Sequence, residues 1–379
     1  ATVWSVLELN NGQYLIGGGF TDVDGIATRD HLMRLNNDGS LDKSFTPPAN
    51  LNAAVNSVAE LNNGQYLIGG AFTNVGNNDR DRLMRLNSDG TLDTNFTPPA
   101  NLDATVWSVL ELNNGQYLIG GEFSNVGGDA NLNGLMRLDT NGSVDLNFAP
   151  PSGTQNVYSV VVLNNGQYLI GGAFTNVGNN DRDRLMRLNS DGTLDTNFTP
   201  PANLDATVWS VLELNNGQYL IGGGFTDVDG IATRDHLMRL NNDGSLDKSF
   251  TPPELNNVVY WVSELRNGQY LIGGYSSEYF NVGGDATLSS LIRLDTAGSL
   301  DTRFTPPEPL NGEFTQVFWF IEASDGTYLV GGDFNEVGGD PTRDNLIRLL
   351  AEPQPPTSVT ATNGESSLLV SWSAPTAND

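Results

Sequence analysis

Gly12-Gln13-Tyr14-Leu15-Ile16-Gly17-Gly18 is the stretch of sequence that decides the fold. Unchanged copies begin at Gly64, Gly115, Gly166, Gly217 and Gly268, and a diverged copy, Gly-Thr-Tyr-Leu-Val-Gly-Gly, begins at Gly326. The steps between successive copies are 52, 51, 51, 51, 51 and 58 residues. A period near 50 residues, with several short strands in each copy, is typical of a β-propeller.

Each repeat is expected to supply four antiparallel strands. In the first repeat they span 3–9, 13–20, 32–36 and 41–45. Asn11-Gly12 is predicted to form a two-residue type I′ hairpin turn, and Asp38-Gly39 is predicted to lie in the turn of a second hairpin. Gly favours both turns because it adopts positive φ at little cost. Pro47-Pro48 then begins a crossover, since Pro donates no hydrogen bond to a sheet. We therefore predict an all-β fold, a seven-bladed β-propeller of four-stranded antiparallel blades.

The period also divides the chain. The propeller is expected over 1–350, with blades at about 1–52, 53–103, 104–154, 155–205, 206–257, 258–314 and 315–350. A proline-rich linker follows at 351–356, and a separate segment at 357–379. After Leu350 the last repeat lacks the Asp-Gly-Ser-Leu-Asp-x-x-Phe segment of the others. Residues upstream of Ala1 are expected to supply that outer strand, so that blade 7 lies next to blade 1.

Two packing features follow from this strand assignment. With a two-residue turn, Leu7 lies opposite Ile16 and Leu9 opposite Tyr14, and these bulky side chains share one face. The other face carries a trough at Gly17, which can receive the bulky face of a neighbouring blade. In the second hairpin a half-buried structural charge pair is expected within each of six repeats: Arg34/Asp42, Arg85/Asp93, Arg137/Asp145, Arg187/Asp195, Arg239/Asp247 and Arg293/Asp301. Arg348 has no such partner.

Composition excludes several classes of protein. The chain has no cysteine, hence no disulfide, thiolate metal site or cysteine nucleophile. With 18 basic and 45 acidic residues its formal net charge is −27, which disfavours nucleic acid and anionic membranes. It has no run of 18 apolar residues, so no membrane insertion is predicted.

The repeat resembles a known family. The pattern Val-x-Ser-Val-x-x-Leu-x-x-Gly-x-Tyr-Leu-Ile-Gly-Gly, followed by Arg-Leu-x-x-Asp-Gly-Ser-Leu-Asp-x-x-Phe, is similar to the delta-60 repeat of bacterial β-propellers and covers 1–350. The Tyr-Leu-Ile-Gly-Gly strand is also similar to kelch repeats, although Phe45 stands where kelch has Trp. The resemblance implies a large secreted or surface-attached bacterial protein of unassigned function, and it supplies no catalytic residue.

The end of the chain resembles a second family. Residues 357–362 and 367–375 are similar to the first two strands of a fibronectin type III domain, and Trp372 matches its core Trp. We expect 357–379 to be the truncated start of such a domain, which two strands alone cannot stabilise. In bacteria these domains are common in extracellular proteins, so the resemblance favours an extracellular or cell-surface location.

One recurring position is aromatic in six of the seven repeats. It lies near the start of the first strand of each repeat, and Asn56 is the exception. One interpretation is a hydrophobic wedge between blades. The other is an aromatic rim that stacks against sugars or peptide side chains and binds the ligand. The candidate ligand-binding residues are Trp4, Trp107, Tyr158, Trp209, Tyr260 and Phe318.

A second recurring position is acidic in six repeats, with Val162 as the exception. Because it ends the innermost strand, its side chains could converge on the axis and bind a cation. The alternative is a set of solvated rim residues. The candidate metal ligands are Glu8, Glu60, Glu111, Glu213, Glu264 and Glu322. Asp22-Val23-Asp24-Gly25 and its copy at 227–230 faintly resemble calcium loops, but a plain turn explains them better.

These observations favour a non-enzymatic protein that carries no cofactor, with calcium as the one candidate. His31 and His236 occupy a position that other repeats fill with Arg, Gly, Ser or Asn, which does not suggest a catalytic base. We expect a monomeric module of a larger chain that binds a carbohydrate or surface protein on the face of the long loops. The alternatives are a structural spacer of a bacterial surface protein and, third, a propeller hydrolase.

Overall fold

The computed structural model describes most of the seven repeats. The described residues are 2–21, 23, 30–49, 51–75, 78–79, 81–100, 102–124, 126, 132–175, 177–179, 183–202, 204–226, 228, 234–275, 290–307, 315–335, 337 and 344–350, with the backbone of 359–363 and 368–372. Within this part of the chain the regular structure is β-strand, apart from the 3-10 turn η3 (Val177–Asn179). No helix among these residues is long and apolar enough to cross a membrane.

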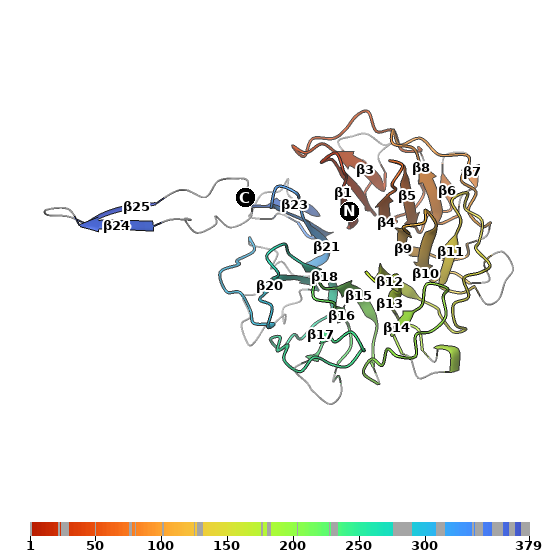
Figure 1. Cartoon of the computed structure of the whole chain (residues 1–379). Helices are drawn as coiled ribbons and strands as arrows, with labels where there is room; N and C mark the ends of the chain where they lie inside the picture. The colour runs from red at the N-terminus through yellow and green to blue at the C-terminus, as the bar shows by residue number, and fades with distance from the viewer. Residues whose placement is uncertain are drawn as a thin grey trace.

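Seven three-stranded antiparallel sheets follow one another around a ring, and the first strand of each lies nearest the centre (Figure 1). These sheets are the blades. In order they are β1 (Val3–Glu8), β2 (Tyr14–Gly18), β3 (Leu32–Leu35); β4 (Val55–Glu60), β5 (Tyr66–Gly70), β8 (Leu83–Leu86); β9 (Val106–Glu111), β10 (Tyr117–Gly121), β11 (Leu135–Leu138); β12 (Val157–Val162), β13 (Tyr168–Gly172), β14 (Leu185–Leu188); β15 (Val208–Glu213), β16 (Tyr219–Gly223), β17 (Leu237–Leu240); β18 (Val259–Glu264), β19 (Tyr270–Gly274), β20 (Leu291–Leu294); and β21 (Gln316–Glu322), β22 (Tyr328–Asp333), β23 (Leu346–Leu349). In the second repeat, β6 (Asn74–Val75) and β7 (Asn78–Asp79) form an additional short two-stranded sheet between β5 and β8 in the sequence.

The ring closes between blade 7 and blade 1. The side chain of Val3 packs over Gly331, where an added Cβ would lie 2.6 Å from Val3 Cγ1. The Ser324 N–H donates to the Glu8 carboxylate at 2.8 Å. The expected proximity of the first and last repeats is confirmed by these contacts, which join segments more than 300 residues apart.

The first hairpin differs from the prediction by one residue of register. Its turn contains three residues, 10–12, because the Leu9 N–H donates to the carbonyl oxygen of Gln13 at 2.8 Å and the Gly12 N–H donates to Leu9 at 2.8 Å. Only Gly12 has positive φ, at 82°, whereas a type I′ turn needs positive φ at two residues. The observed partners are therefore Ser5–Gly17, Val6–Ile16, Leu7–Leu15 and Glu8–Tyr14.

The prediction of four-stranded blades is wrong for the outermost strand. Leu41 forms only an isolated bridge with Leu35. Immediately afterwards, Oδ1 of Asp42 accepts the backbone N–H of Ser44 at 2.8 Å. This side-chain turn directs the chain away from the sheet after one bridge. Equivalent bridges occur in blades 1 to 6, and none is found in the described part of blade 7.

The core is divided into seven hydrophobic clusters, each between two neighbouring blades. We call these contacts the seams. At the first seam a Cβ added to Gly17 would lie 2.6 Å from Cγ1 of the fully buried Val55. The predicted glycine trough is thus confirmed, and burying each such Val stabilises the ring by roughly 1.5–3 kcal/mol. The same packing joins Gly69 to Val106, Gly120 to Val157, Gly171 to Val208, Gly222 to Val259, Gly273 to Val317 and Gly331 to Val3.

Beyond the propeller, β24 (Val359–Asn363) and β25 (Leu368–Trp372) pair as an antiparallel hairpin. The hairpin matches the two strands expected from the sequence. The linker 351–356 lies outside the described residues, as do the turn and the end of this segment.

Candidate functional site

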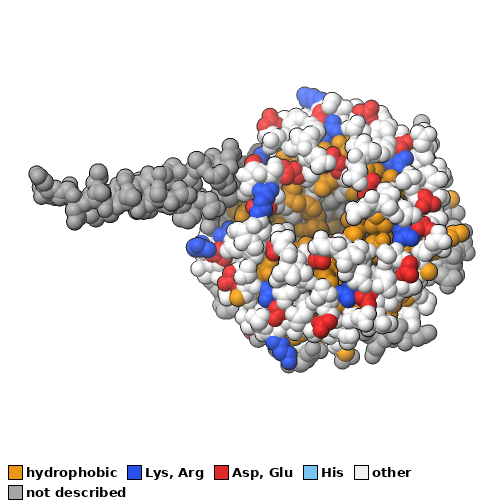
Figure 2. Space-filling view, in the orientation of Figure 1, with side chains coloured by type: hydrophobic (Ala, Val, Ile, Leu, Met, Phe, Trp, Pro, Cys, Tyr) orange, Lys and Arg blue, Asp and Glu red, His pale blue; other side chains and the backbone are white. Residues whose placement is uncertain are grey.

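The first strands of all seven blades enclose a cavity of about 400 Å³. Its lining is mainly aromatic and aliphatic, with a few serine and amide side chains. Figure 2 shows hydrophobic side chains around a hollow near the centre of the ring. The size and composition resemble those of small-molecule sites, which are usually about 300–1,000 Å³ and apolar with a few polar groups.

Six aromatic side chains form a closed loop around this cavity, which we call the axial aromatic circle. They are the six candidate ligand-binding residues from the sequence, and the structure brings all of them together. The centroid separations are 6.0 Å for Trp4–Trp107, 5.7 Å for Trp107–Tyr158, 4.5 Å for Tyr158–Trp209, 5.8 Å for Trp209–Tyr260, 5.1 Å for Tyr260–Phe318 and 4.2 Å for Phe318–Trp4. The circle therefore joins six of the seven blades and passes over blade 2, where the position is Asn56.

The seams between blades are built from other side chains than those of the circle. The seams are filled by valines packed over glycines, and Val55 is fully buried there. The six aromatic side chains are instead half-buried and contact one another on the inner side of the strands. Each ring thus contacts two rings of other blades and also lines the cavity.

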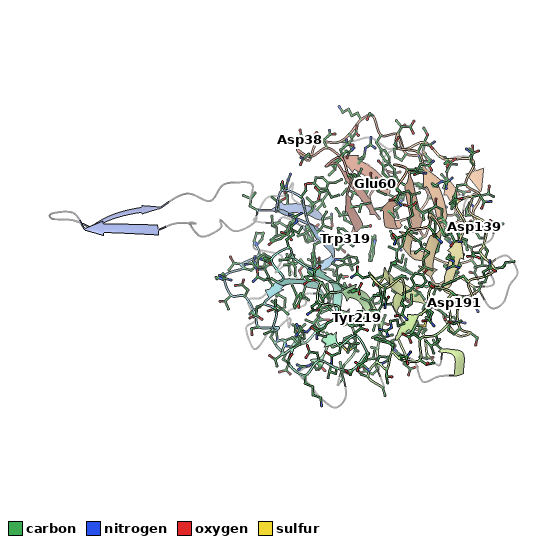
Figure 3. The ribbon with its side chains drawn as sticks, in the orientation of Figure 1. Asp38, Glu60, Asp139, Asp191, Tyr219 and Trp319 are labelled. Atoms are coloured by element: carbon green, nitrogen blue, oxygen red, sulfur yellow. The ribbon has the colours of Figure 1, made fainter. Side chains whose placement is uncertain are left out.

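The residue after the aromatic position also lines the cavity in six of the seven blades, and the sequence analysis missed its importance. It is serine in blades 1 to 5, and Oγ of Ser57 accepts the Val109 N–H of the next blade at 3.2 Å. Blades 6 and 7 carry Trp261 and Trp319 instead, whose ring centroids are 5.2 Å apart. Trp319 lies beside the centre of the ring in Figure 3. The departure from the Val-x-Ser-Val pattern was the signal in the sequence.

Polar groups interrupt the circle on the side of blades 2 to 4. Asn56 stands where the other blades have an aromatic side chain, so Trp4 and Trp107 meet edge to face in front of it. The Tyr158 hydroxyl donates to Oε1 of Glu122 at 3.1 Å. Burial first, and then the charge of Glu122, raises the pKa of Tyr158 to about 12, so the hydroxyl stays protonated. The lining is therefore more polar on the side of blades 2 to 4, although blade 7 also contributes the Gln316 amide.

The six candidate metal ligands are not brought together. Each Glu carboxylate accepts a backbone N–H from the first turn of the preceding blade and so joins two blades. The pairs are Glu60–Asn10 at 2.8 Å, Glu111–Asn62 at 2.7 Å, Glu213–Asn164 at 2.8 Å, Glu264–Asn215 at 2.8 Å, Glu322–Arg266 at 2.7 Å and Glu8–Ser324 at 2.8 Å. Val162 interrupts the series between blades 3 and 4.

This arrangement differs from the axial convergence that the cation hypothesis required. Among the described residues, no three His, Cys, Asp or Glu side chains are grouped closely enough to hold a metal ion. The two loops that resemble calcium sites, at 22–25 and 227–230, lie largely outside the described residues. The carboxylates are better explained as hydrogen-bond acceptors between blades.

The predicted Arg–Asp pairs are confirmed in six blades, at N–O distances of 2.7–3.0 Å. In blade 1 the Arg34 guanidinium also lies 4.7 Å from the centroid of Phe45 and donates to the Tyr66 hydroxyl of blade 2 at 3.1 Å. Burial alone would raise the pKa of Asp42, but hydrogen bonds from Ser44, Arg34 and Gln13 outweigh it and lower the pKa. We call this assembly of Arg, Asp and Phe the clasp, and it is structural.

Arg348 is the exception, as the sequence indicated. Its guanidinium bonds to Asp325 and, through Nε, to the Thr327 hydroxyl at 2.9 Å, both in the first hairpin of its own blade. Nη1 also donates to the carbonyl oxygen of Asn37 in blade 1 at 2.8 Å. Blade 7 thus keeps the contact with its neighbour but has neither the Asp nor the Phe of the clasp.

The two histidines occupy a backbone position that sequence reasoning misread as an exposed strand end. His31 and His236 have φ of 65° and 66°, and Arg82, Arg184 and Asn345 adopt the same left-handed conformation. Burial lowers the pKa of His236, whose side chain lies away from the axial cavity lining. The position needs positive φ, which explains why Gly134 is accepted there.

Comparison with known families assigns the repeats. A family model described as "Domain of unknown function (DUF5122) beta-propeller" matches 9–45, 61–96, 112–148, 163–198, 214–250, 265–304 and 323–352. The matches cover more than half of the chain, one per blade, and the chain belongs to this family. The match ends at 352, so no fibronectin type III domain is shown. No curated protein matches the sequence significantly.

Solved structures agree with the fold alone. Virginiamycin B lyase from Staphylococcus aureus is 13% identical, with a TM-score of 0.53 over 79% of this chain and 83% of the lyase. Puromycin hydrolase is 13% identical, with a TM-score of 0.56 over 96% of this chain and 56% of the hydrolase. At this identity neither likeness transfers an activity.

Proposed function

We propose that the protein is a non-enzymatic binding module of a secreted or surface-attached bacterial protein, and that its axial cavity holds a sugar unit of a glycan or surface polymer. The observation that carries this proposal is the axial aromatic circle around a cavity of about 400 Å³. Six aromatic side chains line this one cavity, and the seams between blades are filled by other residues. Their remaining surface is suited to a ligand rather than to the fold.

The chemistry of the lining supports a carbohydrate. The C–H faces of a pyranose ring pack on aromatic rings, and its hydroxyls need a small number of oriented polar partners. The lining offers the side-chain amides of Asn56 and Gln316 together with serine hydroxyls. No Asp, Glu, Lys, Arg or His contributes to the lining that the structure describes. Such a surface binds a neutral ligand and lacks an acid–base pair for hydrolysis.

The position of the circle fits access from the face of the long loops. Trp4 is the second residue of β1, and Val3 pairs with Gly18, the last residue of β2, from which the long loop leaves. The tight turns at 10–12 lie at the opposite end of the strands. The proposed site therefore agrees with the expectation that binding takes place on the long-loop side.

The remaining parts of the proposal concern the larger protein. The similarity of 357–379 to a fibronectin type III start, together with the hairpin of β24 and β25, supports an adjoining extracellular module. A spacer without a specific ligand is the competing function. The spacer function is favoured by the near-identical seams, because a rigid propeller could also act as one unit of an extended, multidomain spacer.

A glycan and cell-wall polymer array, followed by calorimetric titration, tests the proposal. The Trp107→Ala and Trp209→Ala variants are expected to bind the captured glycan at least about tenfold more weakly. They are expected to lose more in binding than in stability, although each also gives up two ring contacts with its neighbours. Leu146→Ala is the matched control, because Leu146 is 81% exposed and is not part of the cavity lining.

Two results would count against the proposal. If the intact protein retains no glycan or polymer on the array, the spacer function is favoured. If both Trp variants unfold, Trp209→Phe keeps an aromatic ring with less volume and tests binding in a folded protein. Unchanged affinity in that variant and in Asn56→Ala would place the ligand elsewhere.

A further inference from the structure

We propose that the axial cavity selects sugars that carry an N-acetyl group, and that the deepest part of the cavity receives this group. The inference rests on the proposed function, because it names the class of sugar that the same cavity takes. It is carried by two buried hydroxyls that have no hydrogen-bond partner among the described residues. Aliphatic side chains line the cavity wall beside them.

A β-bulge in the first strand brings two successive residues of a blade to the cavity. In blade 1, Val3 pairs with Gly18 and Ser5 with Gly17, so Trp4 has no partner in the ladder. The same irregularity recurs in all seven blades. A regular strand would turn successive side chains to opposite faces, but here both Trp4 and Ser5 line the cavity. The residue after the axial aromatic circle therefore forms a second layer of the wall.

The serines of this second layer differ in whether they hold the blades together. Ser57, Ser159 and Ser210 each accept the backbone N–H of a valine in the next blade, at 3.1–3.2 Å. Ser5 and Ser108 are only 4% and 9% exposed and line the cavity. Neither of these two hydroxyls has a hydrogen-bond partner in the part of the chain that the structure describes. Because a buried hydroxyl without a partner costs free energy, both are suited to a ligand.

Aliphatic side chains lie beside these hydroxyls on blades 2 to 4. On these blades the lining continues further along the first strand, to Val58, Val109 and Val160, all more than nine-tenths buried. The corresponding residues of the other four blades are described but are not part of the lining. The cavity is therefore deepest along blades 2 to 4, across the ring from Trp261 and Trp319 of blades 6 and 7 (Figure 1). We call this part the inner pocket, formed by Ser5, Ser57, Val58, Ser108, Val109, Ser159 and Val160.

The chemistry of the inner pocket matches an acetamido group better than the other common substituents of sugars. The described lining holds no charged side chain, so it would compensate neither the ammonium group of an amino sugar nor the anionic group of a uronic or sulfated sugar. A hydroxyl would bond to the serines but leave the valines without an apolar partner. An acetamido group is neutral, its methyl group can pack on the valines, and its carbonyl oxygen accepts from Ser5 or Ser108.

Matched pairs of sugars test this preference by calorimetric titration of the full chain. One pair is the β-linked trisaccharides of N-acetylglucosamine and of glucose, and the other is the methyl glycosides of N-acetylgalactosamine and of galactose. Within a pair only the acetamido group is exchanged for a hydroxyl. At least one N-acetylated sugar is expected to bind about tenfold more tightly than its hexose partner. The trisaccharide of glucosamine, which is charged, is expected to bind no more tightly than that of glucose.

Two serine variants at the same position of the repeat locate the effect in the inner pocket. The double variant Ser5→Ala/Ser108→Ala is expected to reduce the ratio of affinities within the preferred pair about fivefold. Its melting temperature should not fall, because neither hydroxyl bonds to the described fold. Ser210→Ala is the matched control, since Ser210 is not part of the lining and accepts the Val262 N–H at 3.2 Å. It is expected to lower the melting temperature and to leave the ratio unchanged.

The outcomes separate this inference from the proposed function. If the array captures a glycan but neither N-acetylated sugar binds more tightly than its hexose partner, the acetamido inference is overturned and the binding function stands. The inference is also overturned if the double serine variant keeps the full preference. If neither the array nor the titrations detect a bound sugar, both proposals fall.

Discussion

The seams and the axial cavity lining are built from the same inner strands but differ in how strictly they repeat. At every seam a glycine of one blade receives a valine of the next, and an added Cβ would come within 2.5–2.8 Å of that valine. In the lining, one position changes among Trp, Asn, Tyr and Phe, and its neighbour changes from Ser to Trp in blades 6 and 7. Both surfaces belong to strands that are otherwise nearly identical.

The difference separates what the ring needs from what it is free to vary. A seam has no spare volume, because a protein interior is packed as densely as an organic crystal. The cavity has about 400 Å³ of open space, so its side chains can change without a clash. Among the inner strands, variation at the cavity agrees with the proposed binding function, whereas repetition at the seams indicates a scaffold.

The largest expected effect comes from acid, which acts on all six clasps together. Burial raises the pKa of Asp195, but hydrogen bonds from Asn197, Gln167 and Arg187 outweigh it and lower the pKa. A carboxylate with a lowered folded-state pKa stabilises the fold above its unfolded value of about 3.9, and this contribution is lost as the pH falls toward the folded-state value. The melting temperature is expected to fall steeply below about pH 4. A melting temperature that is level from pH 5 to the acid limit would contradict this.

Breaking a single clasp is the next largest effect. Asp195→Asn leaves Arg187 buried without its counter-charge, and such changes cost roughly 3–5 kcal/mol. Asp191→Asn is the matched control, since Asp191 lies in the exposed turn and its carboxylate accepts the N–H and hydroxyl of the nearby Thr193. Urea denaturation compares the two unfolding free energies. Equal stability of the two variants would mean that the clasp does not hold the seam.

A methyl group at a seam is expected to cost less, about 1–3 kcal/mol. In Gly222→Ala the new Cβ would lie 2.6 Å from Cγ1 of Val259. Gly224→Ala adds the same atom two residues later, where the nearest contacts are 3.7 Å away. Blades 2 and 4 already carry Ala71 and Ala173 at that second position. Thermal unfolding should give a lower melting temperature for Gly222→Ala than for Gly224→Ala. Equal melting temperatures would show that the seam has room for an added methyl group.

The smallest effect on stability is expected in the lining. Asn56→Tyr would complete the axial aromatic circle and add ring contacts of about 0.5–1.5 kcal/mol each, so the melting temperature should stay the same or rise slightly. Binding of any glycan captured on the array should weaken, because the Asn56 amide is lost. A destabilisation as large as that of Gly222→Ala would place this position in the scaffold instead.

The repeat by itself determined the number of blades, the strand order and the Arg–Asp pairs, because each depends on local pattern and on turns within about ten residues. Asp42, for example, follows Arg34 across one short loop. The sequence also singled out the six aromatic positions. It did not reveal the three-residue first turn, since Asn11-Gly12 is compatible with two hairpin types and only the hydrogen bond from Gly12 to Leu9 distinguishes them.

Only the tertiary structure decided which partners the glutamates and the aromatic side chains meet in other blades. The sequence left two alternatives for the glutamates, an axial cation site or a solvated rim, and in the structure each instead binds a turn of the preceding blade, as Glu60 binds Asn10. Their partners are about 50 residues away in five cases and 316 in the sixth, so no local pattern could indicate them. Likewise Trp4 and Phe318 become neighbours only when the ring closes. Strand patterns fix which face a side chain occupies, but the curvature and closure of the ring decide whether that face meets a neighbouring blade or a cavity.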